Sequence, residues 1–223
     1  MKRTRLKNRS LPDYTRGEEI FNMVSHIVGG AFGIAALVLC VVSSALRGDP
    51  WAVVGGAVYG CSMVLLYTMS SVYHGLLPET AKKVMQVLDH CSIYLLIAGT
   101  YTPVALCAIR PLYPAWGWAL FGGVWAIAAT AIVFTAIDLK KYAVLSMICY
   151  IGMGWCVVLA AEPAIRSIPL PGLAWLLAGG VAYTVGAVLY GLGKKRRYMH
   201  SVFHLFVLAG SILQFVSIYC YIL

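Results

Sequence analysis

Long runs of apolar residues, separated by short polar stretches, make up nearly the whole chain. A helix needs about 20 such residues to cross the hydrocarbon core of a bilayer. The stretches between the runs, such as RGDP, DLKK and GKKRR, contain Gly, Pro or charged residues that favour turns. The pattern predicts seven membrane-spanning helices, at residues 22–46, 51–74, 86–109, 115–137, 142–161, 170–192 and 198–221.

This pattern is typical of an all-α integral membrane protein, a bundle of seven transmembrane helices. A β-barrel would show short segments of alternating polarity instead. We expect a single transmembrane domain at residues 22–223, preceded by a basic cytoplasmic segment at residues 1–21. The first apolar run is long enough to span the membrane and has polar residues at its entry, which favours an anchored helix over a cleaved signal peptide.

Composition excludes several classes of protein. Of the 223 residues, 61% are hydrophobic and only 11% are charged, whereas a soluble domain of this size needs far more polar surface. The net charge of +9 would suit nucleic acid, but the basic residues lie between the apolar runs, where membrane topology explains them. The seven cysteines form no CxxC pair, so we expect neither a disulfide framework nor a thiolate metal site.

The basic residues predict a cytoplasmic N-terminus and a C-terminus outside the membrane, because cytoplasmic loops carry an excess of Lys and Arg. With this orientation, three basic residues lie outside, namely Arg47, Arg110 and Arg166. Fourteen lie inside: Lys2, Arg3, Arg5, Lys7, Arg9, Arg16, Lys82, Lys83, Lys140, Lys141, Lys194, Lys195, Arg196 and Arg197. Tryptophans then gather at the outer interface, at Trp51, Trp116, Trp118 and Trp175.

All the histidines fall at the cytoplasmic ends of the predicted spans, at His26, His74, His90, His200 and His204. The pair in HSVFH is spaced by about one helical turn, so both imidazoles project from one face and could reach a single metal ion. A bare HxxxH pair is more often two unrelated side chains, so it needs partners elsewhere in the chain. Asp89, at the start of the third span, lies at the same depth.

Other polar residues follow the same trend. Glu19, Asn22 and His26 share one face of the first helix, and Ser70 precedes His74 by one turn. Ionisable groups at the edge of a bilayer are costly unless they are paired or liganded, so convergence explains them together. Glu19 and Asn22 fit a solvated entry turn equally well.

Taken singly, these side chains also have simpler explanations. His74 and His90 could face lipid headgroups at the interface. Asp89 could cap the third helix, because aspartate favours helix N-termini. Ser70 could donate a hydrogen bond to a carbonyl of its own helix. Only their joint placement favours a metal site.

Four stretches, EEIFNMVSH, SSVYHGLLP, LDHCSIYLLIAGTYTP and HSVFHLFVLAGS, resemble the haemolysin III family. That family belongs to a wider superfamily of adiponectin and progestin receptor-like membrane proteins, which also includes alkaline ceramidases. The resemblance extends over nearly the whole chain. The compact loops look like those of a bacterial member, which implies a multi-pass protein of the bacterial inner (plasma) membrane.

The resemblance implies a zinc ion held by three histidines near the cytoplasmic face, with a water between the zinc and an aspartate. The matching metal ligands in this chain are His74, His200 and His204. Asp89 matches the aspartate and Ser70 matches a serine one turn before the first ligand, so these two residues are the implied catalytic pair.

Four further residues are candidates for supporting positions around the ligands, namely Glu19, Asn22, His26 and His90. His90 has no certain counterpart in the receptor branch. Adjacent residues diverge by ~100° around a helix, so we expect Asp89 and His90 not to face the site equally.

Three protein nitrogens with an open fourth position form the catalytic type of zinc site. Set among apolar helices, such a site predicts a zinc-dependent hydrolase of a lipid amide or ester, with a membrane lipid as substrate or ligand. Two alternatives stay open. One is a receptor-like or membrane-homeostasis protein in which zinc is structural, and the other is a pore-forming cytolysin. The oligomeric state is not indicated by the sequence.

Overall fold

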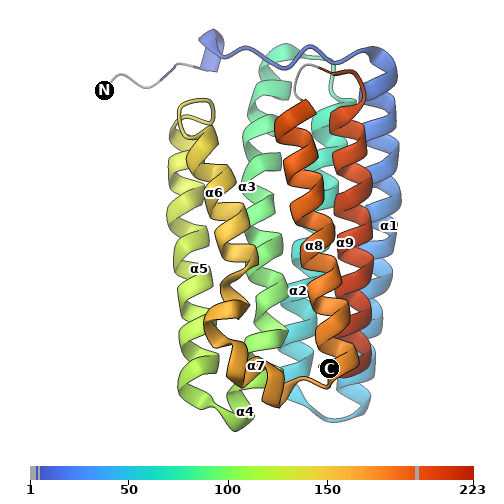
Figure 1. Ribbon diagram of the computed structural model, residues 1–223. Coiled ribbons are helices and arrows are strands. Elements are labelled where there is room, and N and C mark those ends of the chain that lie inside the picture. Colours follow the sequence, from blue (N-terminus) through green and yellow to red (C-terminus); the bar gives the residue numbers. More distant parts are fainter. Residues whose placement is uncertain (1–3, 5, 194–195) are drawn as a thin grey trace.

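The computed structural model describes residue 4 and residues 6–193 and 196–223. This part of the chain is helical throughout and contains no strand. Seven helices are long and apolar enough to cross a membrane, which confirms the predicted fold class. The short helix η1 (Leu6–Asn8) and the end of the last helix lie at opposite ends of the bundle (Figure 1).

Five of the seven spans consist of a single uninterrupted helix. The uninterrupted helices are α1 (Arg16–Leu46), α2 (Pro50–Gly75), α5 (Pro114–Ile137), α8 (Leu170–Gly193) and α9 (Met199–Tyr221). The third span joins α3 (Glu79–Pro103), the π-helical η2 (Val104–Ile109) and α4 (Arg110–Leu112). The fifth joins α6 (Ala143–Gly154), the 3₁₀ helix η3 (Cys156–Ala160) and α7 (Ala161–Ser167).

The first helix begins at Arg16, six residues earlier than predicted, because a capping box stabilises its start. The Thr15 side chain accepts a hydrogen bond from the Glu18 backbone N–H, and the Glu18 carboxylate accepts one from the Thr15 backbone N–H. These bonds satisfy donors that a helix N-terminus otherwise leaves unpaired. Glu19 and Asn22 therefore belong to the helix and not to a solvated entry turn.

The third helix begins at Glu79, seven residues earlier than predicted. Asp89 consequently lies inside α3, and the expectation that it could cap this helix is wrong. At the other end, Pro103 has no N–H to donate and its ring crowds the preceding turn. The π-helical turn η2 follows it directly.

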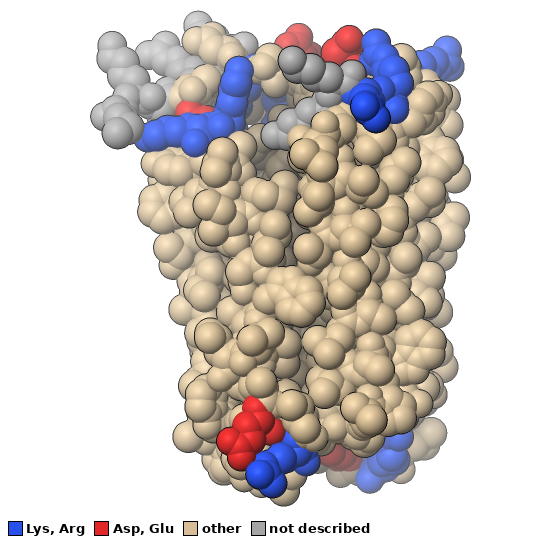
Figure 2. Space-filling view, viewed as in Figure 1, with Lys and Arg blue, Asp and Glu red and all other residues tan. Residues whose placement is uncertain are grey.

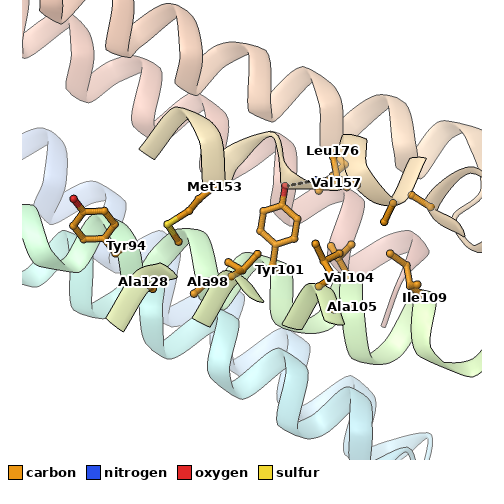
Figure 3. Packing of buried hydrophobic residues seen from close by; sticks show 14 of the residues in the cluster. Tyr94, Ala98, Tyr101, Val104, Ala105, Ile109, Ala128, Met153, Val157 and Leu176 are labelled. Atoms are coloured by element: carbon orange, nitrogen blue, oxygen red, sulfur yellow. Dashed lines mark hydrogen bonds between the residues drawn. The ribbon is translucent and has the colours of Figure 1, made fainter. Parts of the chain in front are cut away.

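The fifth span continues through part of the stretch EPAIRSIPLP, which the sequence had indicated as a loop. It is interrupted at Trp155, between α6 and η3. Tyr101 of α3 bridges the interruption, because its hydroxyl donates to the Gly154 carbonyl at 2.8 Å and accepts from the Val157 N–H at 2.9 Å (Figure 3). The backbone groups freed by the break are thus paired inside the bundle, where water could not satisfy them.

The third span is the most deeply buried of the seven and forms the centre of the bundle (Figure 1). Its side chains Tyr94, Ala98, Tyr101 and Val104 pack against Ala128 and Met153 of neighbouring helices, among others (Figure 3). A second buried cluster joins α1, α2 and α9 around Tyr59, Met63 and Tyr67.

Charged residues lie at the two ends of the molecule, and the surface between them is free of charge on the face that Figure 2 shows. This distribution is what a membrane-spanning bundle requires. At the end remote from η1, the rings of Trp51 and Trp118 meet edge to face at 6.0 Å. Five of the basic residues used for the predicted orientation, Lys2, Arg3, Arg5, Lys194 and Lys195, lie outside the described residues, as does the Lys7 side chain.

Gly60 allows α1 and α2 to pack in close contact. A Cβ at this position would lie 2.6 Å from the Cα of Leu37, whereas a Cβ at Gly122 of α5 would meet nothing within 4 Å. We expect Gly60→Ala to lower the stability of the protein in detergent by about 1–3 kcal/mol, because neither helix can yield without losing contacts. Gly122→Ala is the matched control and should leave the melting temperature unchanged or slightly higher. Equal melting temperatures for the two variants would contradict this packing.

The orientation in the membrane can be tested with reporter fusions at the two chain ends. A cytoplasmic N-terminus and an odd number of spans predict opposite responses, with a cytoplasmic reporter active at the N-terminus and an external reporter active at the C-terminus. Active cytoplasmic reporters at both ends would show that the orientation or the number of spans is wrong.

Candidate metal centre

Three histidines from two helices converge at the end of the bundle that carries η1. His74 lies in the last turn of α2, and His200 and His204 lie in the first turns of α9. The Nε2 atom of His200 is 3.3 Å from that of His74 and 3.1 Å from that of His204. Ligand nitrogens of one tetrahedral ion are separated by about 3.3 Å, so this group could hold a metal ion.

Glu19 determines which nitrogen of His74 points into the group. Its Oε2 lies 2.6 Å from Nδ1 of His74, and its Oε1 pairs with Nζ of Lys82 at 2.8 Å. The carboxylate therefore accepts the proton of Nδ1, which leaves the Nε2 lone pair free for a metal. Glu19, predicted to support the ligands, thus makes the kind of contact that orients a metal-binding histidine.

The start of α9 is attached to the start of α1 by Glu18, which the sequence reasoning missed. The Glu18 carboxylate accepts a hydrogen bond from the Tyr198 N–H at 2.7 Å and lies 3.4 Å from Nη1 of Arg197. Tyr198 adopts a left-handed backbone conformation with φ of 61° immediately before the helix. The spacing of Thr15 and Glu18 was a signal that could have identified this carboxylate as a helix-capping group.

His26 and Asn22 support α9 from the neighbouring helix α1. The His26 ring stacks on His204 with the ring centroids 3.7 Å apart, and neither of its nitrogens has a hydrogen-bond partner within the described part of the chain. The Asn22 Oδ1 accepts a hydrogen bond from the Ser201 hydroxyl at 2.7 Å. Both side chains contact the helix that carries two of the three clustered histidines, and neither belongs to the cluster itself.

Asp89 and Ser70 lie on the wall of a cavity of about 600 Å³, which His200 and His204 also line. Ser70 interacts with the Asp89 carboxylate. Asp89 does not join the three histidines as a further ligand within 4.8 Å, which leaves the group with three protein ligands in the described chain. The structure thus brings the predicted serine and aspartate to the same cavity as the predicted ligands.

His90 also lines this cavity, although its ring is held back on its own helix. Its Nδ1 is 2.8 Å from the Gln86 carbonyl oxygen and 3.7 Å from Oδ2 of Asp89. Asp89 and His90, adjacent in the sequence, thus both reach the cavity wall. His90 lies outside the group of clustered histidines.

Tyrosines surround the histidine group, and the sequence reasoning did not identify them. Tyr14 stacks on His200 with centroids 5.0 Å apart and an interplanar angle of 11°. The ring centroid of Tyr73 lies 4.5 Å from that of His74, and the ring centroid of Tyr190 lies 5.2 Å from that of His200. Burial raises the pKa of the Tyr14 phenol, so this ring remains neutral beside the histidines.

Residues 6–15 run across the end of the bundle (Figure 1), and several of them line the cavity. The Thr4 N–H donates to the Asp138 carboxylate at 3.0 Å, and the Arg9 guanidinium donates to the Ile137 carbonyl at 2.9 Å. Hydrogen bonds from Thr4 lower the pKa of Asp138 to about 2, which keeps this carboxylate charged at neutral pH. The N-terminal residues that line the cavity are Thr4, Asn8, Arg9, Ser10, Leu11 and Pro12.

Fold and site together define a multi-pass α-helical membrane protein with a three-histidine group at one end of the bundle. The chain belongs to the haemolysin III family, because the family model "Haemolysin-III related" matches residues 14–215. The resemblance seen in the sequence is thereby confirmed.

Relatives of known name cover most of the chain. It is 39% identical over 207 residues to Hemolysin-3 of Bacillus cereus, which covers 92% of each chain. It is 37% identical over 209 residues to the Hemolysin-3 homolog of Bacillus subtilis (strain 168), covering 93% of this chain and 96% of the relative. A more distant match, 25% identical over 197 residues, is the human monocyte to macrophage differentiation factor, with 85% and 79% covered.

The histidine group can be tested by metal analysis of the purified protein. We expect about one metal ion per chain, and we expect His200→Ala or His204→Ala to remove most of it, because two nitrogens alone hold a metal weakly. His90→Ala is the matched control and should retain the metal, since His90 lies outside the group. Undiminished metal in the His200→Ala, His204→Ala double variant would exclude this site.

The contact between Glu19 and His74 can be tested separately from the ligands. Glu19→Gln keeps the shape of the side chain but weakens the acceptor for the Nδ1 proton, and we expect metal affinity to fall by about 10–100-fold. Glu79→Gln removes a carboxylate that pairs with Lys83 at 2.6 Å and should leave affinity unchanged. Competition with a chelator of known affinity measures the metal affinity of both variants. A Glu19→Gln variant that binds metal as tightly as the wild-type protein would show that Glu19 does not orient His74.

Proposed function

We propose that this chain is a zinc-dependent hydrolase that cleaves a lipid amide or ester from within the membrane. The observation that carries the proposal is one cavity whose wall holds part of the histidine group together with Asp89 and Ser70. A bound zinc ion with three imidazole ligands and an open position would acidify a water and polarise a carbonyl. Imidazole also suits other transition metals, and the family resemblance favours zinc among them.

In this proposal Asp89 is the general base. Its carboxylate is buried, with 8% of the residue exposed, and it faces the cavity beside Ser70. It would take a proton from the attacking water and return it to the leaving nitrogen or oxygen. The net reaction adds one water across the amide or ester and yields a carboxylic acid with an amine or alcohol. The Ser70 hydroxyl would donate a hydrogen bond to the developing oxyanion.

The shape and lining of the cavity favour a lipid over a soluble substrate. Its volume of about 600 Å³ is that of a typical ligand site. Much of its wall is apolar, with Ile93, Leu96, Ile97, Met147, Phe203 and Val207 among the lining side chains. Figure 2 shows a furrow down the uncharged face of the bundle, where α6 and α8 lie in the matching view of Figure 1.

A second candidate is a receptor-like or membrane-homeostasis protein in which the metal only braces the helices. One observation favours it, because the histidine group and its supporting contacts connect α1, α2 and α9. A pore-forming cytolysin is suggested by the name of the Bacillus cereus relative. A pore through one chain is less favoured, since an apolar cluster that includes Val104, Ala105 and Ile109 fills the bundle on the far side of Tyr101.

Asp89→Asn separates hydrolysis from bracing. The amide cannot accept the proton, so we expect turnover to fall by about 100-fold or more, with metal content and melting temperature unchanged. Asp49→Asn at the other end of the bundle is the matched control, because Asn caps a helix as well as Asp. Fatty-acid release from a panel of ceramides and lipid esters, followed by mass spectrometry, measures turnover. No release by the zinc-loaded protein across the panel would favour the bracing role.

A further inference from the structure

The cavity has a second polar region, formed by the N-terminal segment at residues 8–12. Arg9 is part of the cavity wall there. One of its guanidinium nitrogens, Nη2, donates to the Ile137 carbonyl at 2.9 Å, which orients the group. Its Nε is buried and has no hydrogen-bond partner within the described residues. Since a guanidinium carries five N–H donors, Arg9 retains donors for a ligand.

The Asp138 carboxylate, which interacts electrostatically with Arg9, is already engaged by other groups. Asp138 is 2% exposed and accepts hydrogen bonds from the backbone N–H groups of Thr4, at 3.0 Å, and Lys141, at 3.2 Å. In the described part of the chain, Arg9 makes no ion pair within 4.0 Å. The Asp138 carboxylate interacts with Arg9 electrostatically but not by direct contact, so it takes up none of the guanidinium donors.

The same part of the wall carries a second cation and lacks a second carboxylate. Lys140, three residues after the Ile137 carbonyl that Arg9 binds, also lines the cavity and is exposed. Among the described lining residues the only acidic side chain is Asp89, which lies beside Ser70. The mouth of the cavity is therefore positively charged, whereas its interior is largely apolar.

We propose that Arg9 and Lys140 form an anion subsite at the mouth of the cavity, which binds the phosphate or carboxylate of a single-chain amphiphile. Arginine suits this ligand because its planar fork can donate two parallel hydrogen bonds to either group. The apolar chain of the amphiphile lies along the inner wall, towards Ile97 and Tyr101. This proposal shares one premise with the proposed function, namely that a lipid occupies the cavity. It narrows the substrate class to anionic lipids.

The test compares two ligands that share one chain and differ in headgroup, hexadecyl phosphate and hexadecylphosphocholine. Neither contains an amide or a carboxylic ester, so their binding is independent of hydrolysis. The zinc-loaded protein is placed in nanodiscs of phosphatidylcholine, and the affinities are measured with radiolabelled ligands. We expect the wild-type protein to bind hexadecyl phosphate at least about tenfold more tightly, as hydrogen bonds between charged groups predict.

Arg9→Gln should abolish this preference, and Lys140→Gln should reduce it. Arg16→Gln is the matched control, because Arg16 is exposed near the same segment and is absent from the cavity wall. Metal content and melting temperature of each variant show whether it is folded. Inorganic phosphate should compete only at far higher concentration, because it lacks the chain that the apolar wall binds.

Three outcomes would overturn the subsite. The first is a preference for hexadecyl phosphate that survives in folded Arg9→Gln. The second is an equal loss of this preference in Arg16→Gln, which would indicate surface charge alone. The third is competition by inorganic phosphate at the concentrations that suffice for hexadecyl phosphate. A protein that hydrolyses no lipid but shows the Arg9-dependent preference would contradict the proposed hydrolysis and support the subsite. A protein that hydrolyses lipids but shows no such preference would support the proposed hydrolysis and contradict the subsite.

Discussion

The architecture depends on one constraint, which is that a polar side chain inside a membrane bundle needs a partner within the protein. Water is absent from the hydrocarbon core, so an unpaired imidazole or carboxylate there is costly. Glu19 meets this requirement for His74 on one side and for Lys82 on the other. The Nε2 atom of His200 lies 3.3 Å from that of His74 and 3.1 Å from that of His204, in an arrangement that a metal ion would satisfy better than hydrogen bonds between neutral rings.

The same constraint explains how the helices are held around the group. Glu18 pairs with the Tyr198 N–H and so attaches the start of α9 to the start of α1, while Asn22 accepts a hydrogen bond from Ser201 one turn further along. At the centre of the membrane Tyr101 pairs both backbone groups at the break in the fifth span. The cavity extends as far as Tyr101 and Trp155 at this break, so its apolar inner part can hold a long apolar ligand.

Much of the fold could be predicted because apolar runs of sufficient length have few alternatives to membrane helices. The helix starts at Arg16 and Glu79 were missed, since polar residues can extend a span beyond the hydrocarbon core when caps or ion pairs support them. The clustering of His74, His200 and His204 followed from their common depth and from the resemblance to a family. The contact of Glu18 with α9, the stacking of Tyr14 and the position of Arg9 could not be found in this way, because they join segments far apart in the sequence.

The central claim is that the three histidines hold one zinc ion and leave a position open for water. X-ray absorption at the zinc edge, recorded on purified protein, tests it most directly. The account predicts three imidazole nitrogens at ~2.0–2.1 Å together with one further oxygen at a similar distance, and no sulfur. A fourth protein ligand, a sulfur at about 2.3 Å, or the absence of zinc from protein prepared without chelators would contradict it.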